Sequence, residues 1–418
     1  MIKTTLMAVS LVVLGVTGWL FYDGLPRRIG AEPIKVGILH SLTGTMSISE
    51  KSVVDATLLA IEEINAKGGI LGRKIEAIVS DGKSDSPTFA KEAQRLITLE
   101  KVSVVFGCWT SASRKTVKPI FEKYKHLLFY PLQYEGLEQS TNIVYTGAAP
   151  NQQIIPAVKW AFDNLGKKFF LVASDYVFPH SANEIIKAQV AALGGQIVGE
   201  EYLLLGSKET KGIVRKIKVA RPDVILNTLN GDTNVAFFAE LRIAGVTPDR
   251  IPTVSFSIGE KELRSMNPNA MAGDYAAWNY FQTIDSSDNH EFVRRFKEKF
   301  GADTVLTDPM EAAYIGVHLW AQAARDAGSA DPTAVRKAVL DQSFNAPEGI
   351  VHLDPETQHL WKTVRIGKIR PDGQFDIVWT SDNPIRPTPY PPYRSKTEWE
   401  KFLHDHYQGW GQSWVNPG

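Results

Sequence analysis

The chain has 418 residues, in which 46 Lys and Arg are balanced by 46 Asp and Glu. A balanced charge provides no electrostatic footprint for nucleic acid or for an anionic membrane surface, and the length allows two domains with sizeable cores. The single cysteine, Cys108, excludes an intramolecular disulfide and a cysteine-rich metal site. It does not decide the compartment, because many exported proteins also lack disulfides.

Residues 1–33 are predicted to form a signal or anchor segment. The run from Thr5 to Tyr22 has no charged residue and follows a short basic start at Lys3. This pattern is typical of export, and because no small-residue cleavage site follows directly, an uncleaved membrane anchor is an equal alternative. A buried core helix is disfavoured because the run is apolar all round. We therefore expect a periplasmic or otherwise extracytoplasmic protein, free or held at the membrane by this segment.

Strands and helices alternate from residue 34 onward. The first set is predicted as strands at 34–40, 75–80, 102–106 and 127–130 and helices at 50–66 and 87–100. The sequence Lys67-Gly68-Gly69 ends the first helix, because glycine adopts the left-handed C-cap conformation at least cost. This alternation predicts a parallel sheet wound on both faces.

A second set of similar size follows a predicted crossing at 143–150. Its strands are expected at 169–173, 195–202, 224–227, 251–256 and 275–278, and its helices at 181–193, 212–220 and 235–244. Two such sets predict two similar lobes. The helices expected at 289–300, 309–327 and 332–340 suggest that the chain then returns to the first lobe. A β meander at 350–353, 363–369 and 375–379 and a Pro- and Trp-rich tail from 383, wrapping the surface, complete the chain.

The third and fourth strands end in small polar and aromatic residues. The carboxyl ends of parallel strands are where ligands bind in open α/β sheets. Thr110 and Ser111 can cap a helix and hydrogen-bond a neutral ligand, while Trp109 and Tyr130 offer flat apolar walls. Any one aromatic could equally be a core residue, and only their joint placement favours a site.

Signatures of catalysis are missing from the sequence. It contains no P-loop, dinucleotide-binding, G-x-S-x-G or H-E-x-x-H motif. Cys108 is interpreted as a small buried hydrophobe, and Asp85 as a helix N-cap rather than part of a metal loop. We therefore predict a protein that is not an enzyme and has no cofactor and no metal.

Five segments carry a family resemblance: GCWTSASRK (107–115), YPLQYEGLE (130–138), YTGAAPNQQ (145–153), SDYVFP (174–179) and SFNAPEG (343–349). Residues 34 to about 392 resemble the type I periplasmic binding proteins, in particular the branch that contains the amide sensors and the urea-binding components of urea ABC transporters. The resemblance implies an α/β fold of two doubly wound, Rossmann-like lobes joined by a three-segment hinge at 145–150, 278–284 and 346–350. Lobe 1 is then 34–147 plus 283–346, lobe 2 is 148–282 plus 347–382, and 383–418 is an extension.

The resemblance also implies a set of ligand contacts at the loops of the two lobes. In lobe 1 these are Trp109, Thr110, Ser111, Tyr130, Leu132 and Gln133, and in lobe 2 Tyr176, Asp232 and Glu260. Amino-acid-binding relatives tend to carry a hydroxyl donor where Leu132 stands. Because leucine cannot donate to a ligand carboxylate, a neutral ligand is favoured.

Urea fits these residues on its own chemistry. It has four N–H donors and one carbonyl acceptor, and each unmatched group in a dry site costs about 1–3 kcal/mol. We therefore expect the substrate-binding component of an ABC transporter, which captures urea or a close short-chain amide and delivers it to permease subunits in the inner membrane. The alternatives are an amide- or urea-responsive sensor acting on a regulatory partner and, less favoured, an amidase- or urease-like enzyme.

Overall fold

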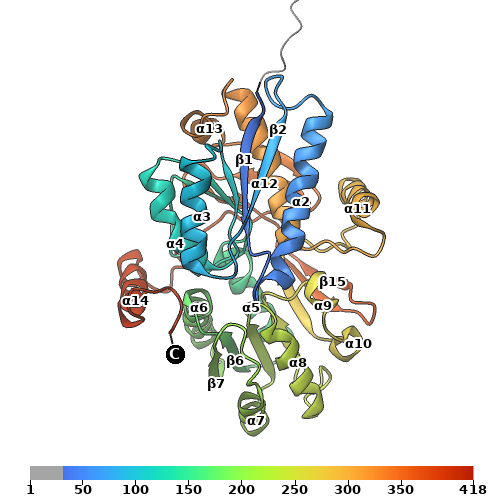
Figure 1. Ribbon diagram of the computed structural model, residues 1–418. Coiled ribbons are helices and arrows are strands. Elements are labelled where there is room, and N and C mark those ends of the chain that lie inside the picture. The colour runs from blue at the N-terminus through green and yellow to red at the C-terminus, as the bar shows by residue number, and fades with distance from the viewer. Residues whose placement is uncertain (1–31, 418) are drawn as a thin grey trace, which may run out of the picture.

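The computed structural model describes residues 32–417, which form two α/β lobes (Figure 1). The predicted signal or anchor segment lies almost wholly outside the described residues. Within 32–417, no helix combines the length and the apolar composition needed to cross a membrane.

Lobe 1 is built on a five-stranded parallel sheet in the order β2-β1-β3-β4-β5. Helix α12 packs against α2, so the chain returns to the first lobe as predicted (Figure 1). The predicted elements are found with ends shifted by a few residues. The bounds are β1 Ile34–His40, α2 Ser47–Ala66, β2 Ile75–Asp81, α3 Ser86–Thr98, β3 Val105–Gly107, α4 Ser111–Lys123, β4 Leu128–Tyr130, β5 Ile143–Tyr145, α11 Ser287–Phe300, α12 Asp308–Asp326 and α13 Pro332–Ala338.

Lobe 2 is built on a seven-stranded mixed sheet in the order β15-β14-β10-β9-β8-β6-β7. The five strands β10, β9, β8, β6 and β7 are parallel to one another. Strands β14 and β15 form an antiparallel hairpin that pairs with β10 through β14. The bounds are η1 Pro150–Gln152, α5 Ile154–Asn164, β6 Lys168–Ser174, α6 Val177–Leu193, β7 Gln196–Leu203, α7 Lys211–Ala220, β8 Val224–Thr228, α8 Thr233–Ile243, β9 Thr253–Ser255, α9 Glu260–Leu263, α10 Pro268–Met271, β10 Tyr275–Trp278, β14 Arg365–Ile369 and β15 Phe375–Thr380.

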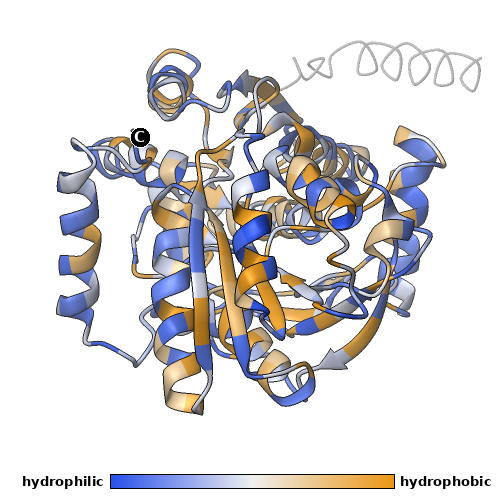
Figure 2. Ribbon diagram, turned by 90° about the horizontal axis from the view of Figure 1, so that it is seen from below, coloured by the Kyte–Doolittle hydropathy of each residue, from blue (hydrophilic) through white to orange (hydrophobic). Residues whose placement is uncertain are grey.

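The sheets are the apolar centres of the lobes. Strands β3, β4 and β5 are buried along their whole length, as continuous apolar runs in a parallel sheet predict. Figure 2 shows central strands that are largely hydrophobic and outer helices that alternate hydrophobic and hydrophilic residues. Gly107 ends β3 in close contact with β1, where an added Cβ would lie 2.1 Å from the carbonyl oxygen of Leu39. Only glycine permits this approach, which sets the position of the loop that begins at Cys108.

A third, three-stranded antiparallel sheet corrects one predicted boundary. It consists of β11 (Ser343–Ala346), β12 (Gly349–Leu353) and β13 (Leu360–Trp361). Val351 and Leu360 belong to the hydrophobic core of lobe 1. Residues 347–361 therefore pack with lobe 1 and not with lobe 2 as predicted, and the expected meander is divided between two sheets.

The chain consequently crosses between the lobes after β5, after β10 and between β13 and β14. The third crossing was predicted at 346–350 and is found at 362–364, because strand pairing of β12 with both its neighbours holds 349–353 on lobe 1. The first two crossings follow the strands after which they were expected.

A buried ion cluster joins these three crossings. The Lys362 ammonium lies 2.6 Å from the Glu348 carboxylate and donates to the carbonyl oxygen of Thr146 at 3.1 Å. Asp308 accepts hydrogen bonds of 2.9 Å from the backbone N–H groups of residues 279 and 280. Burial raises the pKa of Glu348, and the charges of Glu348 and Asp308 hold the pKa of Lys362 above its ordinary value against the opposing effect of burial.

The C-terminal extension docks on lobe 2 through α14 (Lys396–Gly409). Trp399 is fully buried in the core of that lobe, and its indole N–H donates to the carbonyl oxygen of Pro391 at 3.0 Å. The Arg394 guanidinium lies 4.7 Å from the Trp399 ring centre and pairs with Glu184 of α6. The C-terminal extension therefore packs closely on lobe 2, and it includes a regular helix, α14.

Candidate ligand-binding site

Loops of the two lobes meet across the cleft through direct hydrogen bonds. Four of these bonds are Gln133 Nε2 to the carbonyl oxygen of Phe256 (2.9 Å), Trp109 Nε1 to Asn230 Oδ1 (3.4 Å), Ser49 Oγ to Glu262 Oε1 (2.6 Å) and Thr45 Oγ1 to Asp232 Oδ1. The structure therefore has the lobes closed against one another, and three predicted site residues, Trp109, Gln133 and Asp232, contribute to this closure.

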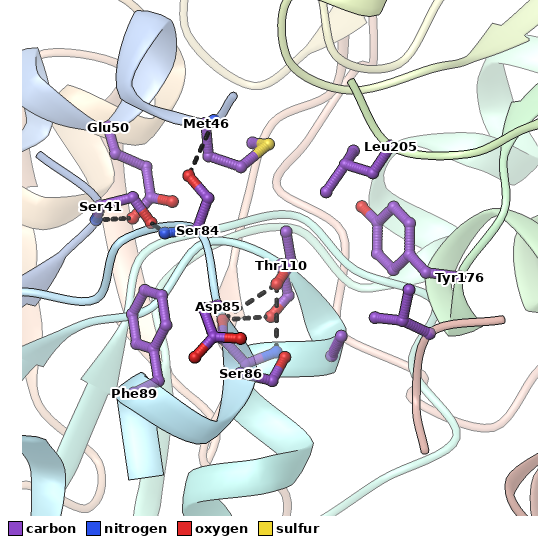
Figure 3. Close-up of a pocket in the computed structure, with 13 residues that line it drawn as sticks. Ser41, Met46, Glu50, Ser84, Asp85, Ser86, Phe89, Thr110, Tyr176 and Leu205 are labelled. Atoms are coloured by element: carbon purple, nitrogen blue, oxygen red, sulfur yellow. Dashed lines mark hydrogen bonds between the residues drawn. The ribbon is translucent and has the colours of Figure 1, made fainter. Parts of the chain in front are cut away.

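A cavity of about 30 Å³ lies between the lobes (Figure 3). Lobe 1 supplies three loops to its wall: the one after β1, the one after β2 and the start of α4. Lobe 2 supplies Tyr176 and Leu205, and the C-terminal extension supplies Val415. The lobe 1 residues of the wall are Ser41, Met46, Glu50, Ser84, Asp85, Ser86, Phe89, Thr110, Ala112 and Ser113.

The loops after β1 and β2 fix a carboxylate and two hydroxyls at the cavity. Glu50, which is 1% exposed, accepts a 2.7 Å hydrogen bond from the backbone N–H of Ser41 and lies 3.0 Å from His40 Nδ1. Ser84 donates its N–H to Ser41 Oγ at 3.0 Å and its hydroxyl to the carbonyl oxygen of Thr43 at 2.9 Å. These bonds hold the polar groups in place before any ligand arrives, which lowers the entropy lost on binding.

The N-terminus of α4 contributes hydrogen-bond donors. Thr110 is the N-cap, and its side-chain oxygen accepts from the N–H of Ser113 at 3.1 Å. The neighbouring Ser111 hydroxyl donates to Glu135 and accepts from the buried guanidinium of Arg114 at 3.0 Å. Thr110 therefore lines the cavity, whereas the Ser111 hydroxyl is engaged with a buried ion pair behind it.

Tyr176 forms the opposite wall. In Figure 3 it faces Ser41, Ser84 and Glu50 across the open centre of the cavity. The side chain is 2% exposed, and burial, reinforced by the neighbouring Tyr130 and Glu135, raises the pKa of its phenol well above the ordinary value. Tyr176 thus stays neutral and can both donate and accept a hydrogen bond.

The other predicted contacts lie around the cavity without lining it. Tyr130 is fully buried, and its hydroxyl donates to the carbonyl oxygen of Trp109 at 2.6 Å. Leu132 is 1% exposed in the core of lobe 1. Glu260 accepts from the backbone N–H of Gln282 at 2.8 Å, and burial raises its pKa to about 8. Of the predicted set, Thr110 and Tyr176 are brought together at the cavity wall, and the ligand roles of the others stay predictions.

Sequence reasoning missed Glu50, Ser84 and Val415 as wall residues. Ser41 had a usable signal, because it directly follows a predicted strand end. Glu50 lies in the first turn of α2, Ser84 lies three residues after the end of β2, and Val415 reaches the cavity only through tertiary packing.

The geometry agrees with two predictions from the sequence, that Cys108 is a small buried hydrophobe and that Asp85 is a helix N-cap. Cys108 is fully buried, and burial raises the pKa of its thiol, so it lacks the accessible thiolate of a nucleophile. Asp85 accepts from the N–H of Thr88 at 2.8 Å as the N-cap of α3, as predicted. Within the described part of the chain, no group of His, Cys, Asp and Glu is arranged to hold a metal ion.

Comparison with known proteins extends over both lobes. Residues 34–396 match the periplasmic binding protein domain. The chain is 24% identical over 348 residues to the Leu/Ile/Val-binding protein homolog 6 of Brucella melitensis biotype 1, covering 81% of this chain and 88% of that protein. The crystal structure of a solute binding protein of an ABC transporter from Rhodopseudomonas palustris BisB5, in complex with 3,4-dihydroxybenzoic acid, aligns with a TM-score of 0.77 at 25% identity, covering 85% of this chain and 98% of that one.

A shorter match is 35% identical to a limonene hydroxylase of Geobacillus stearothermophilus over 124 residues, which are 30% of this chain and 23% of that protein. The long matches confirm the predicted fold class of two α/β lobes with parallel sheets. This chain belongs to the family of periplasmic binding proteins, extracytoplasmic proteins that bind small ligands and deliver them to ABC permeases.

Proposed function

We propose that this protein captures urea, or a close short-chain amide, in the cavity between its lobes and delivers it to an ABC permease. The observation that carries the proposal is the composition of the cavity wall. Among the described residues that line it, the wall combines the Glu50 and Asp85 carboxylates with hydroxyls and has no Lys or Arg. A ligand rich in N–H donors and without a carboxylate matches this wall.

Hydrogen-bond matching supports urea in particular. The Glu50 carboxylate and the Tyr176 and serine oxygens can accept from its N–H groups, while hydroxyls and the first N–H groups of α4 can donate to its carbonyl. Each group left unmatched in a closed cavity costs about 1–3 kcal/mol, so a complementary set is worth a large part of the affinity of so small a ligand.

Size supports the same conclusion. The cavity between the closed lobes is small, at about 30 Å³, which favours a compact ligand over a long or broad one. Leucine and 3,4-dihydroxybenzoate, ligands of the kind named for the relatives, have long or broad apolar bodies and a carboxylate. Either would require the lobes to open further and would place its carboxylate near Glu50 and Asp85.

Calorimetric titration of the purified protein tests the proposal. We expect saturable binding of urea, weaker binding of acetamide and formamide, and none of leucine or 3,4-dihydroxybenzoate. Glu50→Gln, which keeps one oxygen acceptor but removes the charge, should weaken urea binding about tenfold or more. The matched control Glu209→Gln changes an exposed carboxylate and should bind as the parent does. Leucine binding with no urea binding would overturn the proposed ligand.

A further inference from the structure

The C-terminal residues 413–416 reach the interlobe cavity and pair with the loop after β6. The backbone N–H of Val177 donates to the carbonyl oxygen of Trp414 at 3.0 Å, and that of Asn416 donates to Asp175 at 3.2 Å. Tyr176 and Val415 form an antiparallel bridge between these bonds. The segment therefore behaves as a short added strand directly beside a wall residue of the cavity.

This segment has partners in both lobes. On lobe 2 the Asn416 amide donates to the Asp175 carboxylate at 2.8 Å, in addition to the backbone pairing. Toward lobe 1 the ring of Trp414 lies 5.1 Å from the ammonium of Lys115, a residue of α4. The ring of Tyr407 packs 4.5 Å from that of Trp414 and ties the segment to α14. Val415 is thus held in a defined position, with Trp414 at the junction of the lobes.

Among the described residues of the cavity wall, Val415 is the one contributed by the C-terminal extension. It is one of the apolar residues of the wall, together with Met46, Ala112 and Leu205. The cavity is small, at about 30 Å³, so a change in side-chain bulk at residue 415 changes the room within it. Because Val415 also packs against the hydrophobic core of lobe 2, stability has to be measured beside ligand affinity in any variant at this position.

We infer that Val415 is a ligand-contacting residue that sets the upper limit on ligand size, with residues 413–416 as the third wall of the site. The inference rests on the proposed function in one respect, that the ligand occupies the interlobe cavity. It assigns selectivity among small amides to the C-terminal extension, outside the two lobes.

Val415→Ala and Val415→Phe test this, with Val219→Ala as a matched control on an exposed helix residue. Dissociation constants for urea, formamide, acetamide and propionamide are measured by calorimetry, and melting temperatures are measured without ligand. Val415→Ala should shift the propionamide-to-urea affinity ratio at least fivefold toward propionamide. Val415→Phe should weaken all four ligands at least tenfold with little change in melting temperature, and Val219→Ala should match the parent.

The outcomes separate the inference from the proposed function. If the parent binds the amides and the ratio is unchanged in Val415→Ala, the inference is overturned and the proposed function stands. If the parent binds leucine in place of amides, the proposed function fails. The ratio of leucine affinity to alanine affinity is then compared between Val415→Ala and the parent, with valine as the intermediate size. A shift there supports the role of Val415, and an unchanged ratio overturns it. Binding of neither series overturns both.

Discussion

Glu260 offers a test of the electrostatics of the closed structure. It begins α9, is 1% exposed and accepts a hydrogen bond from the backbone N–H of Gln282. Burial raises its pKa from 4.5 to about 8, and the nearby Glu262 and Asp308 add to the increase. Glu260→Gln keeps the shape and an acceptor oxygen but cannot ionise.

The direction in which the stability changes with pH follows from proton linkage. A carboxyl whose pKa is higher in the folded state stabilises the fold below its unfolded pKa, and this stability is lost as the pH rises through the folded pKa. For Glu260 this loss of stability takes place between pH 4.5 and about pH 8. At about 1.4 kcal/mol per pH unit, the parent should lose roughly 4 kcal/mol between pH 5 and pH 9 relative to the glutamine variant, as an upper value.

Guanidinium chloride unfolding at pH 5, 7 and 9, followed by circular dichroism, measures this difference. Urea is unsuitable as the denaturant because it is the proposed ligand. Glu260→Gln should gain stability relative to the parent with each step in pH, whereas the exposed control Glu209→Gln should follow the parent. A constant difference between Glu260→Gln and the parent at all three pH values would refute the reasoning.

Four further predictions follow from the geometry of the site and the core. Trp109→Ala should weaken urea binding about tenfold by removing the bond to Asn230; a core role would instead lower the unfolding free energy of the ligand-free protein by about 3–5 kcal/mol. Trp399→Ala should lower the free energy of unfolding by about 3–5 kcal/mol, because the ring is fully buried. An unchanged melting temperature would contradict the docking of α14. Native Cys108 should resist iodoacetamide at pH 8 and react after unfolding, as mass spectrometry can show. Saturating urea should reduce the radius of gyration in small-angle scattering, and an unchanged profile despite binding would argue against closure.

Most of the strands and helices could be predicted from the sequence. Apolar runs such as 34–40 and 169–173 and the glycine stop at Gly68 depend on local physics, so the strands and helices fell within a few residues of their predicted ends. The rule that ligands bind at the carboxyl ends of parallel strands directed attention to Thr110 and Tyr176, which do line the cavity.

What the sequence could not provide depends on contacts between distant residues. The Ser111 hydroxyl looked free to meet a ligand, but Glu135, 24 positions away, accepts its hydrogen bond. The third crossing, which the resemblance had placed at 346–350, was misplaced because the pairing of β12 with β11 and β13 holds 349–353 on lobe 1. Val415 carries no local pattern that distinguishes it, and its place in the wall follows from the pairing of the tail with Tyr176.

The ion cluster around Lys362 has a mechanical consequence. Because Lys362, Glu348 and Asp308 bind groups from all three crossings, the crossings are joined at one place. A rotation of the lobes about this place would move each residue in proportion to its distance from it. In Figure 1, α7 lies at the end of lobe 2 far from lobe 1, so such a rotation would displace the exposed Val219 of this helix by a large amount. With the exposed Leu99 at the end of α3 on the other lobe, it gives a pair of sites at which two fluorophores would report ligand-driven rotation as a change in distance.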